Sequence, residues 1–118
     1  MSETPSKASI SIQKIDGTVI AQPQIKMMDE NSLKALASAI DEASGSDTGI
    51  TLVILDLSRV SIVPSLALGS LVQIAGKCKA RQQKLKLAGV QPQIRQVFTI
   101  TRLDRVFQFA DTVEAARS

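Results

Sequence analysis

Hydrophobic and polar positions along the chain form two alternating patterns. Short apolar runs, either uninterrupted or alternating with polar residues, indicate strands, and apolar residues at i, i+3, i+4 and i+7 indicate helices. Asp16–Gly17 is a hairpin-turn signal, Asp29 is a suitable helix N-cap, and Gly45 and Gly89 end elements. In chain order, the pattern predicts strands at Ser9–Ile15 and Thr18–Ile25, a helix at Glu30–Ala43, a strand at Ile50–Leu57, a helix at Ser65–Arg81, a strand at Lys84–Ala88 that either lies at an edge or faces a third layer, a helix that begins near Pro92, a short apolar segment at Leu103–Phe109 that forms an optional strand, and a last helical turn capped by Asp111.

The faces of these elements indicate how they pack. Ile50–Leu57 is almost wholly Leu, Val and Ile until Asp56, which is typical of a central strand covered on both faces. Strands that alternate with helices after a hairpin predict a sheet that carries helices. Each long helix has one apolar face, made by Leu33, Leu36, Ala37 and Ile40 in the first and by Leu68, Leu71, Val72 and Ala75 in the second.

Length and composition bound the class of protein. The 118 residues, of which 44% are apolar and 21% charged, are sufficient for one globular domain. No apolar run approaches the length of about 20 residues that spans a bilayer, and the polar start Met1–Ser9 lacks the apolar segment of a signal peptide. Cys78 is the single cysteine, so no internal disulfide is expected and the cytoplasm is the expected location. We expect one domain at residues 9–118 behind a flexible tail at residues 1–8.

Charge is distributed unevenly along the chain. Residues 1–56 contain four Lys and eight acidic residues, a net charge of −4, whereas residues 57–118 contain ten basic and three acidic residues, a net charge of +7. A basic cluster can attract nucleic acid, but the stretch from Lys77 to Lys86 has no interleaved aromatic residue. We therefore expect a solvated face that can attract an acidic protein partner, and no direct contact with nucleic acid.

Missing residue types argue against an enzyme. The chain contains no His, which removes His-based triads, imidazole acid–base catalysis and His metal ligands. A single Cys cannot build a zinc site of the Cys/His kind, and the six Gly are scattered singly, so no nucleotide-binding glycine loop is present. The sequence predicts no catalytic residue, no metal site and no cofactor.

The segment from Leu52 to Gly69 carries the main functional signal. An apolar strand runs into a polar turn, and the turn delivers Ser65 to the start of a helix. A hydroxyl at that place can be an ordinary N-cap or first-turn serine, a nucleophile, or the acceptor of a phosphate, and the residues alone favour the first. Asp56, at the end of the strand, is expected to cap the turn. Cys78 is expected to be a small core or boundary residue.

Three short motifs follow one another at characteristic spacing. They are Asp56-Leu57-Ser58-Arg59-Val60 with the later Ser65, Leu68 and Gly69; Gln91-Pro92-Gln93-Ile94-Arg95-Gln96-Val97-Phe98; and Thr101-Arg102-Leu103-Asp104-Arg105-Val106-Phe107. In this order they resemble the STAS family, which includes the anti-sigma factor antagonists of bacteria, and the resemblance runs from about Ser9 to Ala116. It implies an α/β fold, with a STAS-like mixed sheet of four to five strands, an initial hairpin and helices packed mainly on one side.

The resemblance also implies a function and a site. In that family the first serine of the turn is phosphorylated by a serine kinase that is also the anti-sigma factor, and the phosphate breaks the complex between the two proteins. Ser65 is then the phosphoacceptor, and the partner is an anti-sigma serine kinase or a related regulatory protein. Neither the pattern nor the resemblance defines an oligomeric state. The implied partner-binding surface comprises Val63, Pro64, Ser65, Leu66, Ala67, Gly69, Ser70 and Gln73.

Four residues depart from the family pattern. Pro64 stands in place of Asp, Leu66 in place of a small polar residue, Ala67 in place of Gly, and Arg102 in place of the Gly before Leu103. Pro64 suits the entry to a helix, Leu66 is expected to be exposed, and Arg102 is expected to alter a helix C-cap. Two alternatives stay open: a constitutive scaffold or accessory subunit that docks without phosphorylation, and a nucleotide or anion sensor at the helix N-terminus, which no glycine loop supports.

Overall fold

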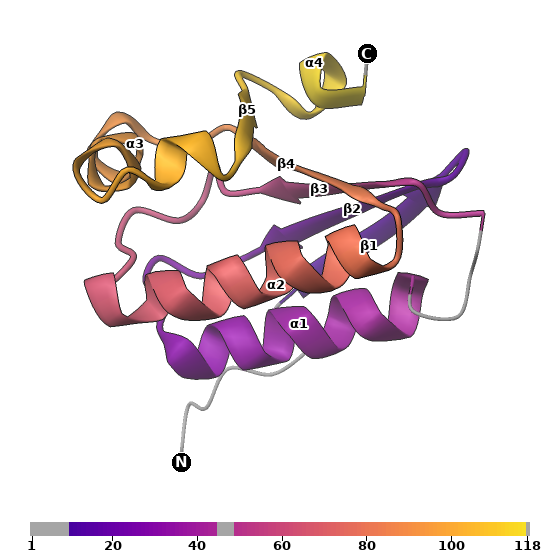
Figure 1. Cartoon of the computed structure of the whole chain (residues 1–118), viewed down its shortest axis with the longest axis horizontal. Coiled ribbons are helices and arrows are strands. Elements are labelled where there is room, and N and C mark those ends of the chain that lie inside the picture. The colour runs from indigo at the N-terminus through magenta and orange to yellow at the C-terminus, as the bar shows by residue number, and fades with distance from the viewer. Residues whose placement is uncertain (1–9, 45–48, 118) are drawn as a thin grey trace.

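In the computed structural model of the protein, which describes residues 10–44 and 49–117, a five-stranded mixed sheet forms the centre (Figure 1). β1 and β2 are an antiparallel hairpin, and each later strand is parallel to its neighbour, so the predicted sheet with its initial hairpin is confirmed. The predicted tail at residues 1–8, Ser9 and the helix stop at Gly45 lie outside the described residues. The spatial order follows the chain: β1 (Ile10–Ile15), β2 (Thr18–Pro23), β3 (Leu52–Asp56), β4 (Lys84–Ala88) and β5 (Gln108–Ala110).

Helices cover the sheet unequally. α1 (Glu30–Ser44) and α2 (Leu68–Ala80) lie side by side on one face, and the short α4 (Val113–Arg117) lies on the other (Figure 1). α3 (Pro92–Ile100) lies beside the end of the sheet at which β3 and β4 finish. The two long helices therefore share one face, as the resemblance implies.

β3 is buried on both faces, as its apolar sequence predicts. Val53 and Leu55 belong to the larger core beneath α1 and α2. Lys86 of β4 donates from Nζ to the carbonyl oxygen of Ala116 at 2.9 Å and so fixes the end of α4. The opposite face of the sheet carries a second apolar cluster beneath α4, made by Ile20, Ile54, Ala88 and Ala116.

The hairpin and α1 begin where the turn and cap signals predict. Asp16 and Gly17 have φ angles of 48° and 80°, which a type I′ turn requires. Asp29 is the N-cap of α1, because its Oδ1 accepts hydrogen bonds from the Ser32 N–H and the Ser32 hydroxyl, both at 2.9 Å. The bond from the Ser32 N–H is the main reason that the pKa of the Asp29 carboxyl lies below its usual value.

Aromatic contacts attach α3 to the rest of the domain. Phe98 is fully buried, and the centre of its ring lies 5.6 Å from that of Phe107 and 5.5 Å from that of Phe109. One turn earlier on α3, the Arg95 guanidinium lies 4.1 Å from the centre of the Phe109 ring. Pro92 occupies the first turn of the helix, as predicted.

Several element boundaries differ from the prediction. β2 ends at Pro23 instead of Ile25, because a proline has no N–H to extend a ladder, and β3 spans Leu52–Asp56, a shorter run than Ile50–Leu57. An edge position, one of the two expected for β4, is wrong, because β4 lies inside the sheet. The apolar segment Leu103–Phe109 supplies a 3-10 turn, η3 (Leu103–Arg105), and leads into the optional strand, β5, which is an edge.

The caps and faces of two helices also need correction. α4 is capped by Thr112 and not by Asp111, because Thr112 Oγ1 accepts from the Ala115 N–H at 3.0 Å. The predicted helix at 65–81 begins as a 3-10 turn, η2 (Ser65–Ala67), before α2 proper. The buried face of α2 also differs from the predicted one, because Val72 and Ala75 are only half-buried. The buried residues are Leu68, Leu71, Ile74 and Cys78, so this face lies closer to α1 than predicted.

Candidate functional site

The loop after β3 holds the residues before Ser65 in place. Asp56 Oδ1 accepts from the Ser58 N–H at 3.1 Å, and the Val60 N–H donates to the carbonyl oxygen of Leu57 at 3.0 Å, so the chain turns tightly after the strand. Val60 and Val63 are then buried in the core. Asp56 therefore caps the turn, as predicted, and the two valines anchor the loop.

A short β-bridge ties this loop to the chain before α1. The carbonyl oxygen of Lys26 accepts from the N–H groups of Ser61 and Ile62 at 2.8 and 3.0 Å, and the Met28 N–H donates to the Ile62 oxygen at 2.9 Å. The bridge pair, Met27 and Ile62, is 48% and 53% exposed. Neither residue is among the predicted site residues, because Met27 lies in a linker without periodicity. The one sequence signal for this bridge is that Ile62 is an apolar residue inside a polar turn.

Ser65 is exposed, and its hydroxyl does not cap the helix. Ser65 is the first residue of η2, and Pro64, at φ −60°, occupies the cap position without any side-chain hydrogen bond to the turn. The Ala67 N–H donates to the Pro64 carbonyl oxygen at 2.9 Å and closes the turn. Among residues 10–44 and 49–117, no hydrogen bond engages the Ser65 hydroxyl. Ser65 is thus a first-turn residue whose hydroxyl is available to another molecule.

The residues implied as partner contacts divide into an exposed and a buried group. Leu66 is 84% exposed, as expected for a residue on the side of η2 away from the core. Val63 and Ala67 are only 7% and 1% exposed, so they cannot form part of a contact surface and instead anchor the loop and the turn to the core. The accessible members are Ser65, Leu66, Gly69 and Gln73, with Pro64 and Ser70 half-buried.

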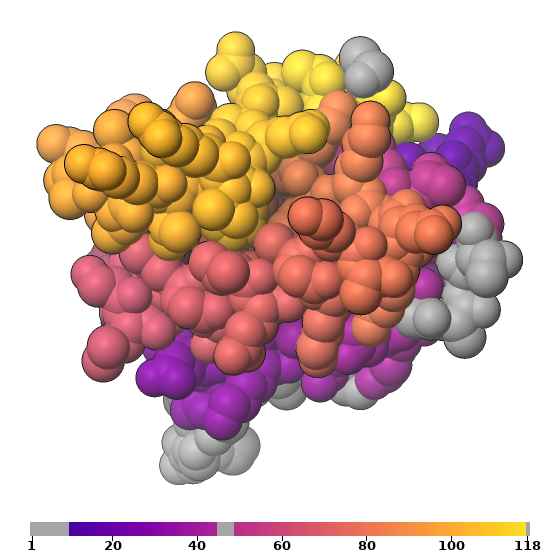
Figure 2. Space-filling view, viewed as in Figure 1, coloured from indigo at the N-terminus to yellow at the C-terminus, as the bar shows by residue number. Residues whose placement is uncertain are grey.

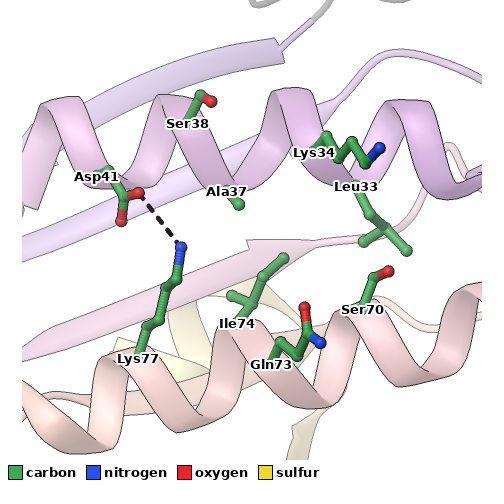
Figure 3. Close-up of a pocket in the computed structure, with 9 residues that line it drawn as sticks. All are labelled: Leu33, Lys34, Ala37, Ser38, Asp41, Ser70, Gln73, Ile74 and Lys77. Atoms are coloured by element: carbon green, nitrogen blue, oxygen red, sulfur yellow. Dashed lines mark ion pairs between the residues drawn. The ribbon is translucent and has the colours of Figure 1, made fainter.

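A groove between α1 and α2 continues from this surface (Figure 3). It holds about 390 Å³ and has Ser70 and Gln73 on its α2 side, with Lys34 and Ser38 on its α1 side. The groove therefore shares Ser70 and Gln73 with the implied contact surface. Its apolar floor consists of Leu33, Ala37 and Ile74.

The far part of the groove ends at a small ion-pair cluster with one more cation than anion. Asp41 accepts a hydrogen bond from the Arg81 guanidinium, and the Lys77 Nζ lies 3.7 Å from Asp41 Oδ2 (Figure 3). Two cations thus face one carboxylate. Cys78 lies on the core side of the same helix, where burial raises the pKa of its thiol, so this thiol is a core group and not a reactive one.

Two other kinds of feature are absent from the described ranges, 10–44 and 49–117. No three His, Cys, Asp or Glu side chains there are grouped so that they could hold a metal ion. In the same ranges, no helix has the length and apolar character needed to cross a membrane.

Comparison with known proteins places this arrangement in a family. Residues 9–116 match the sequence profile of the STAS domain. The chain belongs to the STAS domain family. BtrV of Bordetella bronchiseptica, a curated relative named as a candidate anti-sigma factor antagonist, is 32% identical over 107 residues, which are 91% of this chain and 90% of BtrV.

Solved structures confirm the STAS fold. A candidate anti-sigma factor antagonist from Thermotoga maritima superposes with a TM-score of 0.77 at 19% identity, over 95% of this chain and 97% of that chain. The Bacillus cell fate determinant SpoIIAA in its phosphorylated form superposes with a TM-score of 0.66 at 20% identity, over 90% of this chain and 95% of that chain. At these identities the likeness concerns the fold, and it matches the mixed sheet and hairpin described above.

Proposed function

We propose that the protein is an anti-sigma factor antagonist and acts as a phosphorylation-controlled partner switch on an anti-sigma serine kinase or a related regulatory protein. The observation that carries the proposal is Ser65, which offers an exposed, uncapped hydroxyl on a loop that the core anchors. The relatives support the role: BtrV is named as a candidate anti-sigma factor antagonist, and SpoIIAA has been solved in a phosphorylated form. No step of this function requires catalysis by the STAS domain.

The position of Ser65 suits a switch that works through its surface. A phosphate adds roughly −1.5 to −2 charges at pH 7. The N–H groups of Ala67 and Leu68 already donate to the carbonyl oxygens of Pro64 and Ser65, but the N–H groups before them at the start of η2 have no helical acceptor, so a phosphate at this end is compatible with the fold. A partner surface fitted around a neutral hydroxyl and the exposed Leu66 would instead meet added bulk and buried charge. Phosphorylation then blocks the interface without a large change of shape.

Leu66 favours a second candidate function. A side chain that is 84% exposed beside Ser65 supplies an apolar contact that needs no phosphate to regulate it. In this version the protein is a constitutive scaffold or accessory subunit that docks through Pro64 and Leu66. Both candidates predict that Leu66→Asp abolishes partner binding. They differ in whether binding responds to a kinase and ATP.

The test is phosphorylation of the purified protein. A candidate anti-sigma serine kinase and Mg-ATP are added, and the modified residue is mapped by mass spectrometry on the wild type, on Ser65→Ala, and on Ser61→Ala as the matched control. We expect one phosphate on Ser65 in the wild type and in Ser61→Ala, and none in Ser65→Ala. Modification at another residue contradicts the switch. Tight binding of the kinase by both the wild type and Ser65→Ala, without any phosphate transfer, establishes the scaffold instead.

A further inference from the structure

The segment from Thr99 to Val106, which we call the α3–η3 corner, is the second place where large apolar side chains are exposed. Ile100 is 72% and Val106 51% exposed, and they stand at the end of α3 and directly after η3. In Figure 2 this part of the chain, in orange, forms a projecting corner of the visible face. It belongs to neither the Ser65 surface nor the groove between α1 and α2.

The corner is held rigidly from beneath. Phe98 and Phe107, which flank it in sequence, are buried and in ring contact. The Thr101 hydroxyl donates to the carbonyl oxygen of Val97 at 2.8 Å, and the Val106 N–H donates to that of Leu103 at 2.9 Å. A partner would therefore meet a preformed surface and would not have to order a loop.

Arg102 stands at the centre of the corner on an unusual backbone. Its φ is 64°, in the left-handed region that favours glycine, and its N–H closes the end of α3 on the Thr99 carbonyl oxygen at 3.1 Å. Gln82 ends α2 in the same conformation, so the backbone alone does not single out Arg102. The difference lies in the surroundings, because Arg102 is exposed between exposed apolar residues.

The corner carries a net positive charge. Arg102 and Arg105 are both exposed, and Asp104 is the single acid within the segment. In the part of the chain that the structure describes, no ion pair or hydrogen bond engages either guanidinium. The nearby Arg95 is instead occupied by the Phe109 ring. Two free guanidinium groups beside two apolar side chains are complementary to carboxylates beside apolar side chains.

We infer that the α3–η3 corner is a second docking surface, and that it takes an acidic protein segment in which carboxylates flank apolar side chains. All the basic residues after Lys86 are Arg, and Arg is the cation enriched in protein interfaces because its fork binds a carboxylate in bidentate fashion. An anionic membrane is disfavoured, since electrostatic recruitment to lipid uses clusters of about four to eight basic residues. The inference does not depend on Ser65 being phosphorylated.

The test uses the isolated protein and two defined probes. The ¹⁵N-labelled domain is titrated with the blocked tripeptide Glu-Leu-Glu and with its matched control Gln-Leu-Gln, and amide chemical shifts are followed. We expect the acidic peptide to shift the amides of residues 99–106 in a saturable, salt-sensitive way, and the neutral peptide to leave them unchanged. Arg102→Gly and Arg105→Gln should each weaken the acidic peptide by about tenfold, because each removes a charge-assisted contact.

The controls separate this surface from the others. Lys79→Gln removes an exposed cation on α2, outside the corner, and should leave the titration unchanged. Leu66→Asp alters the Ser65 surface and should also leave it unchanged. Glycine accepts the backbone of residue 102, so Arg102→Gly retains the fold, and Arg105→Gln provides a second test that leaves that backbone untouched. Absence of shifts at residues 99–106, equal shifts from both peptides, or undiminished binding by both variants overturns the inference. A membrane-binding role would also overturn it. In that case the wild type would sediment with vesicles of phosphatidylglycerol and phosphatidylcholine, and Arg102→Gly would abolish this sedimentation.

Discussion

Ser65 owes its availability to the residues around it. Pro64 takes the cap position without a side-chain hydrogen bond, while Val63 and Ala67 turn inward and fix the backbone on both sides. Leu66 is left outside with nearly all of its surface in water. A serine hydroxyl that caps a helix is committed to the backbone, so the absence of a cap here is what makes a phosphoacceptor physically plausible.

Asp29 links a single side chain to the acid stability of the fold. Its pKa lies below the ordinary value of 3.8, mainly because the Ser32 N–H donates to the carboxylate. The unfolded chain therefore takes up the proton first as the pH falls, so the stabilisation is present above the unfolded pKa and is lost as the pH falls through the folded pKa.

The matched variant for this prediction is Asp29→Asn, which keeps a good N-cap but cannot titrate. Urea unfolding measured from neutral pH down to about pH 2 should show a smaller loss of stability on acidification in Asp29→Asn than in the wild type. An identical acid dependence in the two proteins would show that this carboxylate does not contribute.

Arg102 and Gln82 provide a matched pair for the cost of a left-handed backbone. Both have φ above 60° and both follow a helix, so each should be replaced by glycine with a gain in stability. Relief of the left-handed conformation, about 1 to 2 kcal/mol, is partly offset by the entropic cost of glycine, about 0.5 to 1 kcal/mol, so we expect Arg102→Gly and Gln82→Gly each to raise the free energy of unfolding by about 0.5 to 1 kcal/mol, measured in urea. Together with the peptide titration, a more stable Arg102→Gly variant that binds less well would assign Arg102 to recognition. A destabilised Arg102→Gly variant would contradict this account of its backbone.

Among the elements, α2 together with η2 has the most divided role. Its buried face packs on the sheet and on α1, and its other face carries Leu66, Gly69 and Gln73 in solvent. The same segment thus anchors the fold and presents the candidate surface. The two roles therefore belong to opposite faces of the same helix and not to its two ends.

Leu71 and Leu66 test this division within one segment. Leu71 is fully buried, so Leu71→Ala leaves a cavity and should lower the free energy of unfolding by about 3 kcal/mol. Leu66→Ala should change it by less than about 0.5 kcal/mol, because the side chain is already in water. Chemical denaturation of both variants checks the prediction, and comparable destabilisation by the two would contradict the exposed position of Leu66.

The elements show which features a sequence can predict here. Periodicity located β1, α1, β4 and α3 closely, since each has a regular apolar face and a turn, cap or proline signal at one of its ends. The Met27–Ile62 bridge could not be predicted, because it joins two irregular segments far apart in the chain. The cap of α4 was missed because Asp111 and Thr112 are both good N-caps, and only the backbone decides which one faces the helix.

For the residues of the candidate site, exposure to solvent could be predicted only in part. The family resemblance led to Ser65 and Leu66, both of which are exposed. Sequence neighbours of an exposed residue are not all exposed, however, and the inward turn of Val63 and Ala67 depends on how η2 enters α2. The groove between α1 and α2 arises from the packing of two helices, so Lys34 and Ser38 lie outside any motif around Ser65.

Over the whole molecule, the two exposed surfaces lie at the same end of the sheet, because the Ser65 loop follows β3, α3 follows β4, and these two parallel strands finish at that end (Figure 1). The Ser65 surface is set by β3, the Met27–Ile62 bridge and α2, and the α3–η3 corner is set by β5 and the aromatic cluster. Apolar clusters on both faces of the sheet hold these parts in fixed positions. A phosphate on Ser65 would therefore change the surface that a partner meets and leave the fold beneath it unaltered.

The central claim is that this one phosphate controls partner binding. It is tested most directly by isothermal titration of the anti-sigma kinase into the unmodified protein and into the same protein phosphorylated stoichiometrically on Ser65. We predict that the phosphorylated form binds at least about a hundredfold more weakly, since a doubly charged group would have to be buried against the partner, while its unfolding temperature stays close to that of the unmodified form. Equal affinity of the two forms for the kinase would contradict the account.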